Sequence, residues 1–179
     1  VERSAVADAD LVLCTSERDK KLLINKYLPS QDYFVAQNGI YQEDLNVPTV
    51  KEKTTKKIRT ELGISENSSV CLFVGSAHKA NIEAAEQIVE IAQKDSIQNS
   101  NVEFVLIGSV CDDITSDTEV HLLGFVEDLS PYYEIADIAL NPIVSGSGTN
   151  IKVLEYMANN VPVITTDFGS IRLFLGNDY

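Results

Sequence analysis

The chain has 179 residues, of which 44% are apolar, and it contains no Trp and only five Pro. This composition is typical of a globular protein with enough residues for one full domain and part of another. The formal net charge of −13 argues against nucleic acid or an anionic membrane as partner, because both would be repelled over most of the surface. Three widely spaced cysteines fit reduced thiols in a cytoplasmic protein.

Short apolar runs alternate with stretches of helical period along most of the chain. Strands are predicted at residues 11–14, 34–36, 70–74, 103–107, 120–123, 138–141 and 163–166. Helices are predicted between them, at residues 17–27, 55–62, 81–94, 129–135 and 150–158. This alternation predicts an α/β protein with a doubly wound parallel sheet.

Residues 42–57 divide the chain unequally. They are polar and rich in Lys, contain Pro48 and show no apolar period, which predicts a connector. The elements before it are too few for a core of their own. We therefore expect residues 1–45 to be the tail of a preceding domain, truncated at its start, and residues 46–179 to form the main domain.

A glycine-rich turn, Gly146-Ser147-Gly148-Thr149-Asn150, leads directly into the last predicted helix. The start of a helix carries unpaired N–H groups and a partial positive charge, and glycines let an anion approach the backbone closely. The junction therefore predicts a phosphate site.

The helix after this turn has two distinct faces. The face predicted to pack on the core is apolar: Ile151, Val153, Leu154, Met157 and Ala158. The other face starts at the turn: Gly148, Lys152, Glu155 and Asn159. A lysine there can pair with a phosphate, and a glutamate one turn further can accept hydrogen bonds from a sugar diol. The alternative is an ordinary surface Lys–Glu pair, which is common on helices; the glycine turn favours ligand binding.

Glycines also follow three of the predicted strands, at Gly75, Gly108 and Gly124. In open parallel sheets, ligands bind beyond the carboxyl ends of the strands. These glycines and the turn after residue 141 are therefore expected at one ligand-binding edge.

Taken in order, several segments resemble the retaining glycosyltransferases of group 1, which have two Rossmann-like domains in the GT-B fold. Residues 9–16 resemble the last strand of the acceptor-side domain, and residues 35–40 resemble the segment at the domain crossover. Residues 72–85 resemble the first strand, loop and helix of the C-terminal donor domain, and residues 121–126 and 145–162 complete the pattern. The resemblance covers almost the whole chain and implies that the donor domain is truncated after Tyr179.

This resemblance implies roles for four groups of residues. Gly75 and Ser76 would face the donor's diphosphate, and Glu155 would bind the ribose hydroxyls. The base would be contacted through the backbone of Gly124, Phe125 and Val126. The diphosphate and sugar would be approached by the turn: Gly146, Ser147, Gly148, Thr149 and Asn150.

Two departures from the family pattern change what is expected of the site. Ser147 stands where many relatives carry a first glutamate, so recognition of the sugar hydroxyls must differ. The loop Ser76-Ala77-His78-Lys79 lacks the Arg that many relatives have. Lys79, helped by His78, and above all Lys152 would then neutralise the diphosphate and stabilise the leaving group.

The function implied is transfer of a hexosyl group, with retention, from a UDP- or GDP-linked sugar to a glycan or lipid-linked acceptor in polysaccharide biosynthesis. No metal and no other cofactor are expected. Catalytic groups of the acceptor domain would lie upstream, so this stretch is expected to bind donor without turnover. Peripheral membrane association of the full-length protein is left open.

Other readings of the same residues remain. A sugar-nucleotide epimerase shares the two-domain fold, and a non-catalytic interaction domain would bind no nucleotide. A receiver-like signalling domain is disfavoured, because Gly75-Ser76 and Gly108-Ser109 stand where it needs aspartates. His121 is expected to be structural or exposed. The acidic residues expected in a solvated loop are Asp112, Asp113, Asp117 and Glu119.

Overall fold

The computed structural model describes residues 2–27, 32–40, 52–115, 120–146 and 150–174. Two parallel sheets run through these residues, one of two strands and one of five strands. Each strand predicted from the sequence is present, and its bounds lie within one residue of the prediction.

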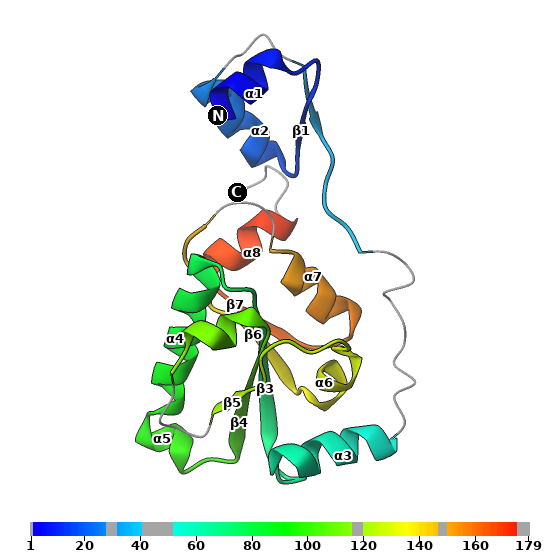
Figure 1. Ribbon diagram of the computed structural model, residues 1–179, viewed down its shortest axis with the longest axis vertical. Coiled ribbons are helices and arrows are strands. Elements are labelled where there is room, and N and C mark those ends of the chain that lie inside the picture. Colours follow the sequence, from blue (N-terminus) through cyan, green and yellow to red (C-terminus); the bar gives the residue numbers. More distant parts are fainter. Residues whose placement is uncertain (1, 28–31, 41–51, 116–119, 147–149, 175–179) are drawn as a thin grey trace.

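The two-stranded sheet pairs β1 (Val12–Cys14) with β2 (Tyr33–Val35). Helices α1 (Glu2–Asp8) and α2 (Glu17–Lys26) lie beside it (Figure 1). Cys14 is buried, whereas Leu13 and its cross-strand partner Phe34 are 63% and 59% exposed. Parallel sheets usually have both faces covered. Within the described residues, one face of this sheet therefore keeps an exposed apolar pair.

The five-stranded sheet has the order β5-β4-β3-β6-β7, and all its neighbouring strands are parallel. Its strands are β3 (Ser69–Val74), β4 (Val102–Ile107), β5 (Val120–Leu122), β6 (Ile138–Asn141) and β7 (Val163–Thr165). The chain adds strands outward from β3 in one direction and then, from β6, in the other. This is the Rossmann-like, doubly wound arrangement that the sequence predicted.

Helices cover both faces of this sheet (Figure 1). One face packs against α4 (Lys79–Ala92), α5 (Asp95–Gln98) and the short helix η2 (Ser109–Asp113). The other packs against α3 (Glu52–Leu62), α6 (Ser130–Ile135) and α7 (Ile151–Ala158). Successive strand residues point to opposite faces, so Phe73 enters the first core and Leu72 the second.

The structure corrects the predicted connector and contains helices that were not predicted. The connector predicted at residues 42–57 ends too late, because α3 begins at Glu52; residues 41–51 lie outside the described part. Only Ile58 and Leu62 of α3 pack on the core, so most of this Lys-rich helix gives no apolar signal. Cys111 lies in η2, and its thiol donates to the Leu106 carbonyl at 3.3 Å. Helix α8 (Asp167–Phe174), which contains a glycine, was not predicted.

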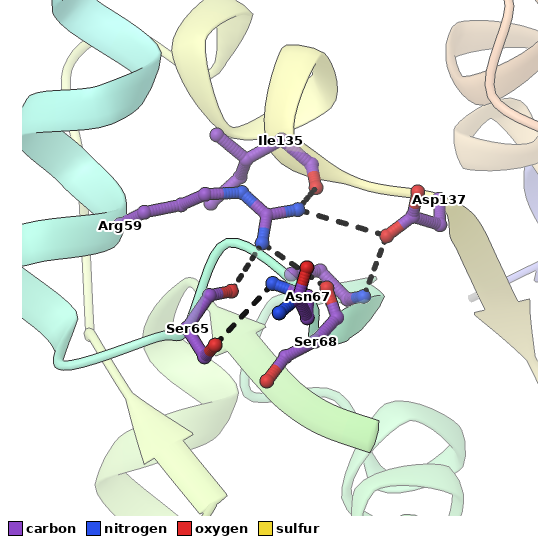
Figure 2. A network of polar contacts seen from close by, with 7 residues as sticks. Arg59, Ser65, Asn67, Ser68, Ile135 and Asp137 are labelled. Carbon is purple, nitrogen blue, oxygen red and sulfur yellow. Dashed lines mark hydrogen bonds and ion pairs between the residues drawn. The ribbon is translucent and has the colours of Figure 1, made fainter. Parts of the chain in front are cut away.

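Arg59 ties α3 to the amino edge of the sheet (Figure 2). One of its terminal nitrogens donates to the carbonyls of Ser65 at 2.9 Å and Ser68 at 3.1 Å. The other donates to the carbonyl of Ile135 at 3.2 Å and lies 3.7 Å from the carboxylate of Asp137. That carboxylate also accepts a hydrogen bond from the first buried residue of β3, the N–H of Val70, at 2.8 Å. A single guanidinium thus connects α3 with the starts of β3 and β6, at the edge opposite the predicted ligand site.

Candidate functional site

The strand order reverses between β3 and β6, which places a ligand-binding edge beyond their carboxyl ends. The hydrogen-bonded register of this pair ends at Leu72↔Ala139, whereas β3 pairs with β4 as far as Val74↔Ile107. The backbone N–H of Val74 donates to the hydroxyl of Tyr156 from α7 at 2.8 Å. A buried side chain of α7 therefore occupies the place where β3 and β6 stop pairing.

Backbone hydrogen bonds hold together the three segments after β3, β4 and β5 in which these glycines lie. Gly75 donates to the carbonyl of Ile107 at 2.9 Å, and Gly108 donates to the carbonyl of Gly124 at 2.7 Å. Gly108 has φ +107°, and a Cβ on it would collide with the carbonyl oxygen of Gly75. Close backbone packing explains the glycine at 108 without any ligand.

The segment predicted to contact the base lies directly after β5. Gly124 has φ +64°, and Phe125, which follows it, is 82% exposed. Val126 turns back and packs against the core on the α7 side. The bond between Gly108 and Gly124 holds this segment at the same edge as Gly75.

The loop from β3 to α4 carries the next predicted residues. Ser76 is exposed, and the ring nitrogen Nδ1 of His78 accepts a hydrogen bond from Ala80 N at 3.4 Å, which makes His78 the N-cap of α4. The side chain of Lys79 is 86% exposed and pairs with Glu83 at 3.7 Å. His78 thus has a structural role as a cap, and Lys79 lies in solvent beside a carboxylate.

Lys152 points from α7 toward α4 and the end of β3. Its ammonium nitrogen lies 2.6 Å from the amide oxygen of Asn81 and 4.4 Å from the ring centroid of Phe73. Burial lowers the pKa of Lys152 to about 8, although the negative charge of Glu155 acts in the opposite direction. This cation is therefore only partly hydrated, and it lies where the strand order reverses.

The rest of α7 corrects the predicted faces. Val153 and Tyr156 are its buried residues, whereas Ile151 and Met157, predicted to face the core, are 44% and 49% exposed. Tyr156 does not belong to the predicted apolar face, although its side chain is fully buried. Its hydroxyl accepts a hydrogen bond from the N–H of Val74, which allows the aromatic ring to be buried in the core.

Glu155 lies one turn after Lys152 and is half-buried. Its charge acts on two buried tyrosines, Tyr133 of α6 and Tyr156 of α7, whose rings meet edge to face with centroids 6.1 Å apart. Burial is the main cause that raises the pKa of each phenol, and the charge of Glu155 raises it further. Of the two residues predicted on one face of this helix, Lys152 thus points toward α4 and Glu155 is half-buried.

The glycine turn is attached to its surroundings at both flanks. Before it, the hydroxyl of Ser145 donates to Glu83 of α4 at 2.8 Å, and Gly146, with φ +112°, lies against Ala80. After it, the side-chain amide of Asn150 donates to the carbonyl of Gly169 in α8 at 3.1 Å. Ser147, Gly148 and Thr149 lie outside the described residues.

Sequence reasoning missed two polar residues of this edge. Asn81 contacts Lys152 through its amide oxygen, and its amide nitrogen donates to the carbonyl and the hydroxyl of Ser76 at 3.0 and 3.2 Å. Glu83 joins Lys79 to Ser145. Both lie in the first turns of α4, directly after a predicted glycine loop, and that position was the only signal available in the sequence.

Within the described residues, no helix is long and apolar enough to cross a membrane, and no group of three or more His, Cys, Asp or Glu side chains could hold a metal ion.

His121 pairs with Glu103 of the neighbouring strand at 3.1 Å, which agrees with its predicted structural role.

The model of the family described as glycosyl transferases group 1 matches residues 68–178. HepE from Anabaena, solved with UDP and glucose, is similar over 90% of this chain and 45% of its own, with TM-score 0.67 and 20% identity. Sucrose-phosphate synthase from Thermosynechococcus elongatus is similar over 92% of this chain and 42% of its own, with TM-score 0.66 and 19% identity.

WaaG, a glycosyltransferase involved in lipopolysaccharide biosynthesis, is similar over 87% of this chain and 43% of its own, with TM-score 0.64 and 19% identity. No match was found among curated protein sequences. The chain thus spans less than half the length of these three structures, and at such identities the likeness establishes the fold alone.

Proposed function

Because the chain belongs to the group 1 glycosyltransferase family, we propose that residues 46–179 bind the nucleoside diphosphate of a sugar donor. The observation that carries the proposal is the position of Lys152, whose ammonium group lies beside the loop after β3 at the reversal of strand order. HepE was solved with UDP-glucose, which supports a nucleotide-linked sugar as the donor. The family match favours glycosyl transfer over epimerisation.

The proposed diphosphate site combines one cation with two loops. Lys152 supplies the charge, while Ser76 of the loop after β3 and Asn150, the N-cap of α7, would add hydrogen-bond donors near the starts of α4 and α7. Lys79 lies at the outer side and would add a solvated charge. Phosphate oxygens accept hydrogen bonds from such groups more strongly than neutral oxygens do.

The nucleoside would lie between the ends of β5 and α7. Gly124, Phe125 and Val126 would contact the base, and the carboxylate of Glu155 would accept hydrogen bonds from the ribose diol. Glu155 is half-buried and one turn from Lys152, which is compatible with a diphosphate and a ribose bound side by side.

In the proposed reaction, the bond between the anomeric carbon and the diphosphate oxygen breaks, and an acceptor hydroxyl oxygen forms the new bond. The proton of the acceptor hydroxyl is released to water, and the electron pair of the broken bond leaves with the diphosphate, which gains one negative charge. Lys152, Lys79 and the helix starts would stabilise that charge as it develops. Retention at the anomeric carbon and a glycan or lipid-linked acceptor belong to the same proposal.

Residues 1–45 would be part of the acceptor-side domain. The support is the exposed apolar pair of the small parallel sheet, Leu13 and Phe34, since such sheets normally have both faces covered. Catalytic groups of that domain would not be present, so we expect the 179-residue chain to bind donor without transferring sugar. Turnover of a donor sugar by this chain alone would contradict that expectation.

A titration that compares ribose with deoxyribose tests the nucleoside part of the proposal. UDP, GDP and their 2′-deoxy forms would be titrated calorimetrically into the wild-type chain and into Glu155→Ala. We expect one ribonucleotide to bind more tightly than its deoxy form by roughly tenfold, as for hydrogen bonds to a charged group. In Glu155→Ala this difference should disappear.

The control variant is Glu61→Ala, a carboxylate on the exposed side of α3 whose removal should leave the ribose preference intact. If Glu155→Ala keeps the full preference for ribose, Glu155 does not bind the diol. If neither UDP nor GDP binds to the wild-type chain, the proposed donor site in this chain is wrong.

A further inference from the structure

The side chain of Asn81 joins helix α7 to the loop after β3. It extends from the first turn of α4, accepts a hydrogen bond from Lys152 at 2.6 Å, and donates to the Ser76 carbonyl at 3.0 Å and the Ser76 hydroxyl at 3.2 Å. Lys152 and Ser76 belong to elements on opposite sides of the point where the strand order reverses. One amide thus connects α7 with the loop after β3.

The chemistry of the partners fixes the orientation of this amide. An ammonium group can only donate hydrogen bonds, and a backbone carbonyl can only accept them. The Asn81 oxygen must therefore face Lys152, and its nitrogen must face the Ser76 carbonyl. The reversed amide would place donor against donor on one side and acceptor against acceptor on the other. A carboxylate or an apolar side chain could satisfy at most one of the two sides.

The packing around Asn81 leaves it little freedom. A Cβ on Gly75 would lie 3.2 Å from Cβ of Asn81 and 3.0 Å from the ring of Phe73, so glycine at 75 lets Asn81 approach the end of β3 closely. The same ring lies under the Lys152 ammonium. Asn81 thus packs against the end of β3 while its amide contacts Lys152 of α7 and Ser76 of the loop after β3.

We propose that Asn81 is the positioning residue of the anion site: its amide holds the Lys152 ammonium and Ser76 in one arrangement before ligand binds. The role in anion binding rests on the proposed function, whereas the contacts of Asn81 with Lys152 and Ser76 do not depend on it. An ammonium group has three N–H bonds. One is directed to Asn81, and no other hydrogen bond of this ammonium group is present within the described residues, so the remaining N–H bonds would meet an anionic ligand. A cation already fixed in place loses less conformational freedom when it binds than a mobile one does.

The first test needs no ligand. The 15N resonance of the Lys152 side chain would be recorded in the wild-type chain and assigned by its absence in Lys152→Arg. We expect protons that exchange slowly with water in the wild type and in Asn81→Asp, which keeps an acceptor for Lys152. In Asn81→Leu, which has a similar size but no acceptor, the exchange should become at least tenfold faster, as the loss of a charged hydrogen bond implies.

A matched control is Asn101→Leu, because Asn101 is exposed at the amino edge, just before β4. The amide spectrum of each variant shows whether it folds, and Asn81→Ala replaces Asn81→Leu if the leucine does not fit. Identical exchange at Lys152 in the wild type and in a folded variant without the acceptor would overturn the proposal.

The second test is a double-mutant cycle with UDP and GDP. We expect Asn81→Leu to weaken binding by about tenfold in the wild-type background and to have no further effect in Lys152→Met. A purely structural role would instead give the same loss in both backgrounds. Asn81→Asp should keep Lys152 in place yet weaken binding, because it loses the bond to Ser76 and adds a negative charge.

The outcomes separate the two proposals. If the wild type binds UDP or GDP and Asn81→Leu binds it equally well, Asn81 is not a positioning residue, and the donor site stands. If no nucleotide binds while Asn81 controls the exchange at Lys152, the donor site is wrong, and the positioning of Lys152 is confirmed.

Discussion

The hydroxyl oxygen of Tyr156 accepts a hydrogen bond from the backbone N–H of Val74 at 2.8 Å. Val74 lies at the end of β3, beyond the last residue of β3 that pairs with β6. Tyr156 is fully buried, and α7 is held against the sheet through it. A structural hydrogen bond thus fixes the helix that carries Lys152 and Glu155. The consequences for stability and for binding can be measured separately.

Tyr156→Phe should lower the free energy of unfolding by about 1–3 kcal/mol, because it leaves a buried N–H without a partner. Urea unfolding measures this change. The control is Tyr132→Phe, a partly buried tyrosine whose hydroxyl makes no side-chain hydrogen bond within the described residues. Equal stability of Tyr156→Phe and the wild type would show that water or another group satisfies Val74.

Gly108→Ala should destabilise the chain by more than about 1 kcal/mol, because the residue has φ +107° and its Cβ would collide with the Gly75 carbonyl. Gly39→Ala is the matched comparison, since a Cβ there meets nothing within 4 Å. Chemical denaturation of both variants checks the prediction. A stable Gly108→Ala would mean that the backbone of β3 and β4 can separate at low cost.

Arg59→Met should reduce stability by roughly 2–3 kcal/mol, the sum expected for three hydrogen bonds to carbonyl groups. Lys57→Met on the same helix removes only an exposed ion pair with Glu61 and should cost less than about 0.5 kcal/mol. Because Arg59 lies at the amino edge, we expect Arg59→Met to leave nucleotide affinity unchanged at temperatures where it is folded. A similar loss of stability in the two variants would contradict the role of Arg59.

The pKa of Lys152, lowered by burial to about 8, predicts how binding changes with pH. The terminal phosphate of UDP and GDP loses its second proton at about pH 6, so both ligands are largely ionised by about pH 7.5. Their affinity should therefore fall as the pH rises from about 7.5 to 9 and Lys152 loses its proton. Lys152→Arg remains charged over this range and should show a flatter profile. Parallel profiles for the two proteins would show that Lys152 is not the titrating group.

The stability of the ligand-free chain should change in the opposite direction. The pKa of Lys152 is depressed from 10.5, so between about pH 8 and pH 10.5 the unfolded chain binds more protons than the folded chain. The contribution of Lys152 to stability should thus rise with pH over this window. Urea unfolding of the wild type, compared with Lys152→Met at each pH, isolates that contribution.

Much of the fold could be predicted from the sequence, because buried parallel strands are short apolar runs and leave a clear signal between helical stretches. Helices whose contact with the core is small gave no such signal. The first turns of α3 are rich in Lys and Thr, and α8 contains Gly169 within its first turn. Their ends are set by tertiary contacts that one sequence does not display.

The candidate site was predicted as a set of segments but not as a set of contacts. Lys152 was placed correctly on a helix that follows a glycine turn, yet nothing in the sequence linked it to Asn81, which is 71 residues earlier. The same limit applies to Ser145 and Glu83, which are 62 residues apart. Such pairs depend on how β3 and β6 lie side by side, and this follows from the strand order of the whole sheet.

The central claim is that Lys152 supplies the charge that binds a nucleoside diphosphate. Calorimetric titration of UDP, GDP, uridine and guanosine into the wild-type chain, Lys152→Met and Lys57→Met tests it most directly. The account predicts saturable binding of one diphosphate to the wild type and to Lys57→Met, and binding at least about tenfold weaker to Lys152→Met. Equal affinity of the diphosphate for the wild type and Lys152→Met would contradict it.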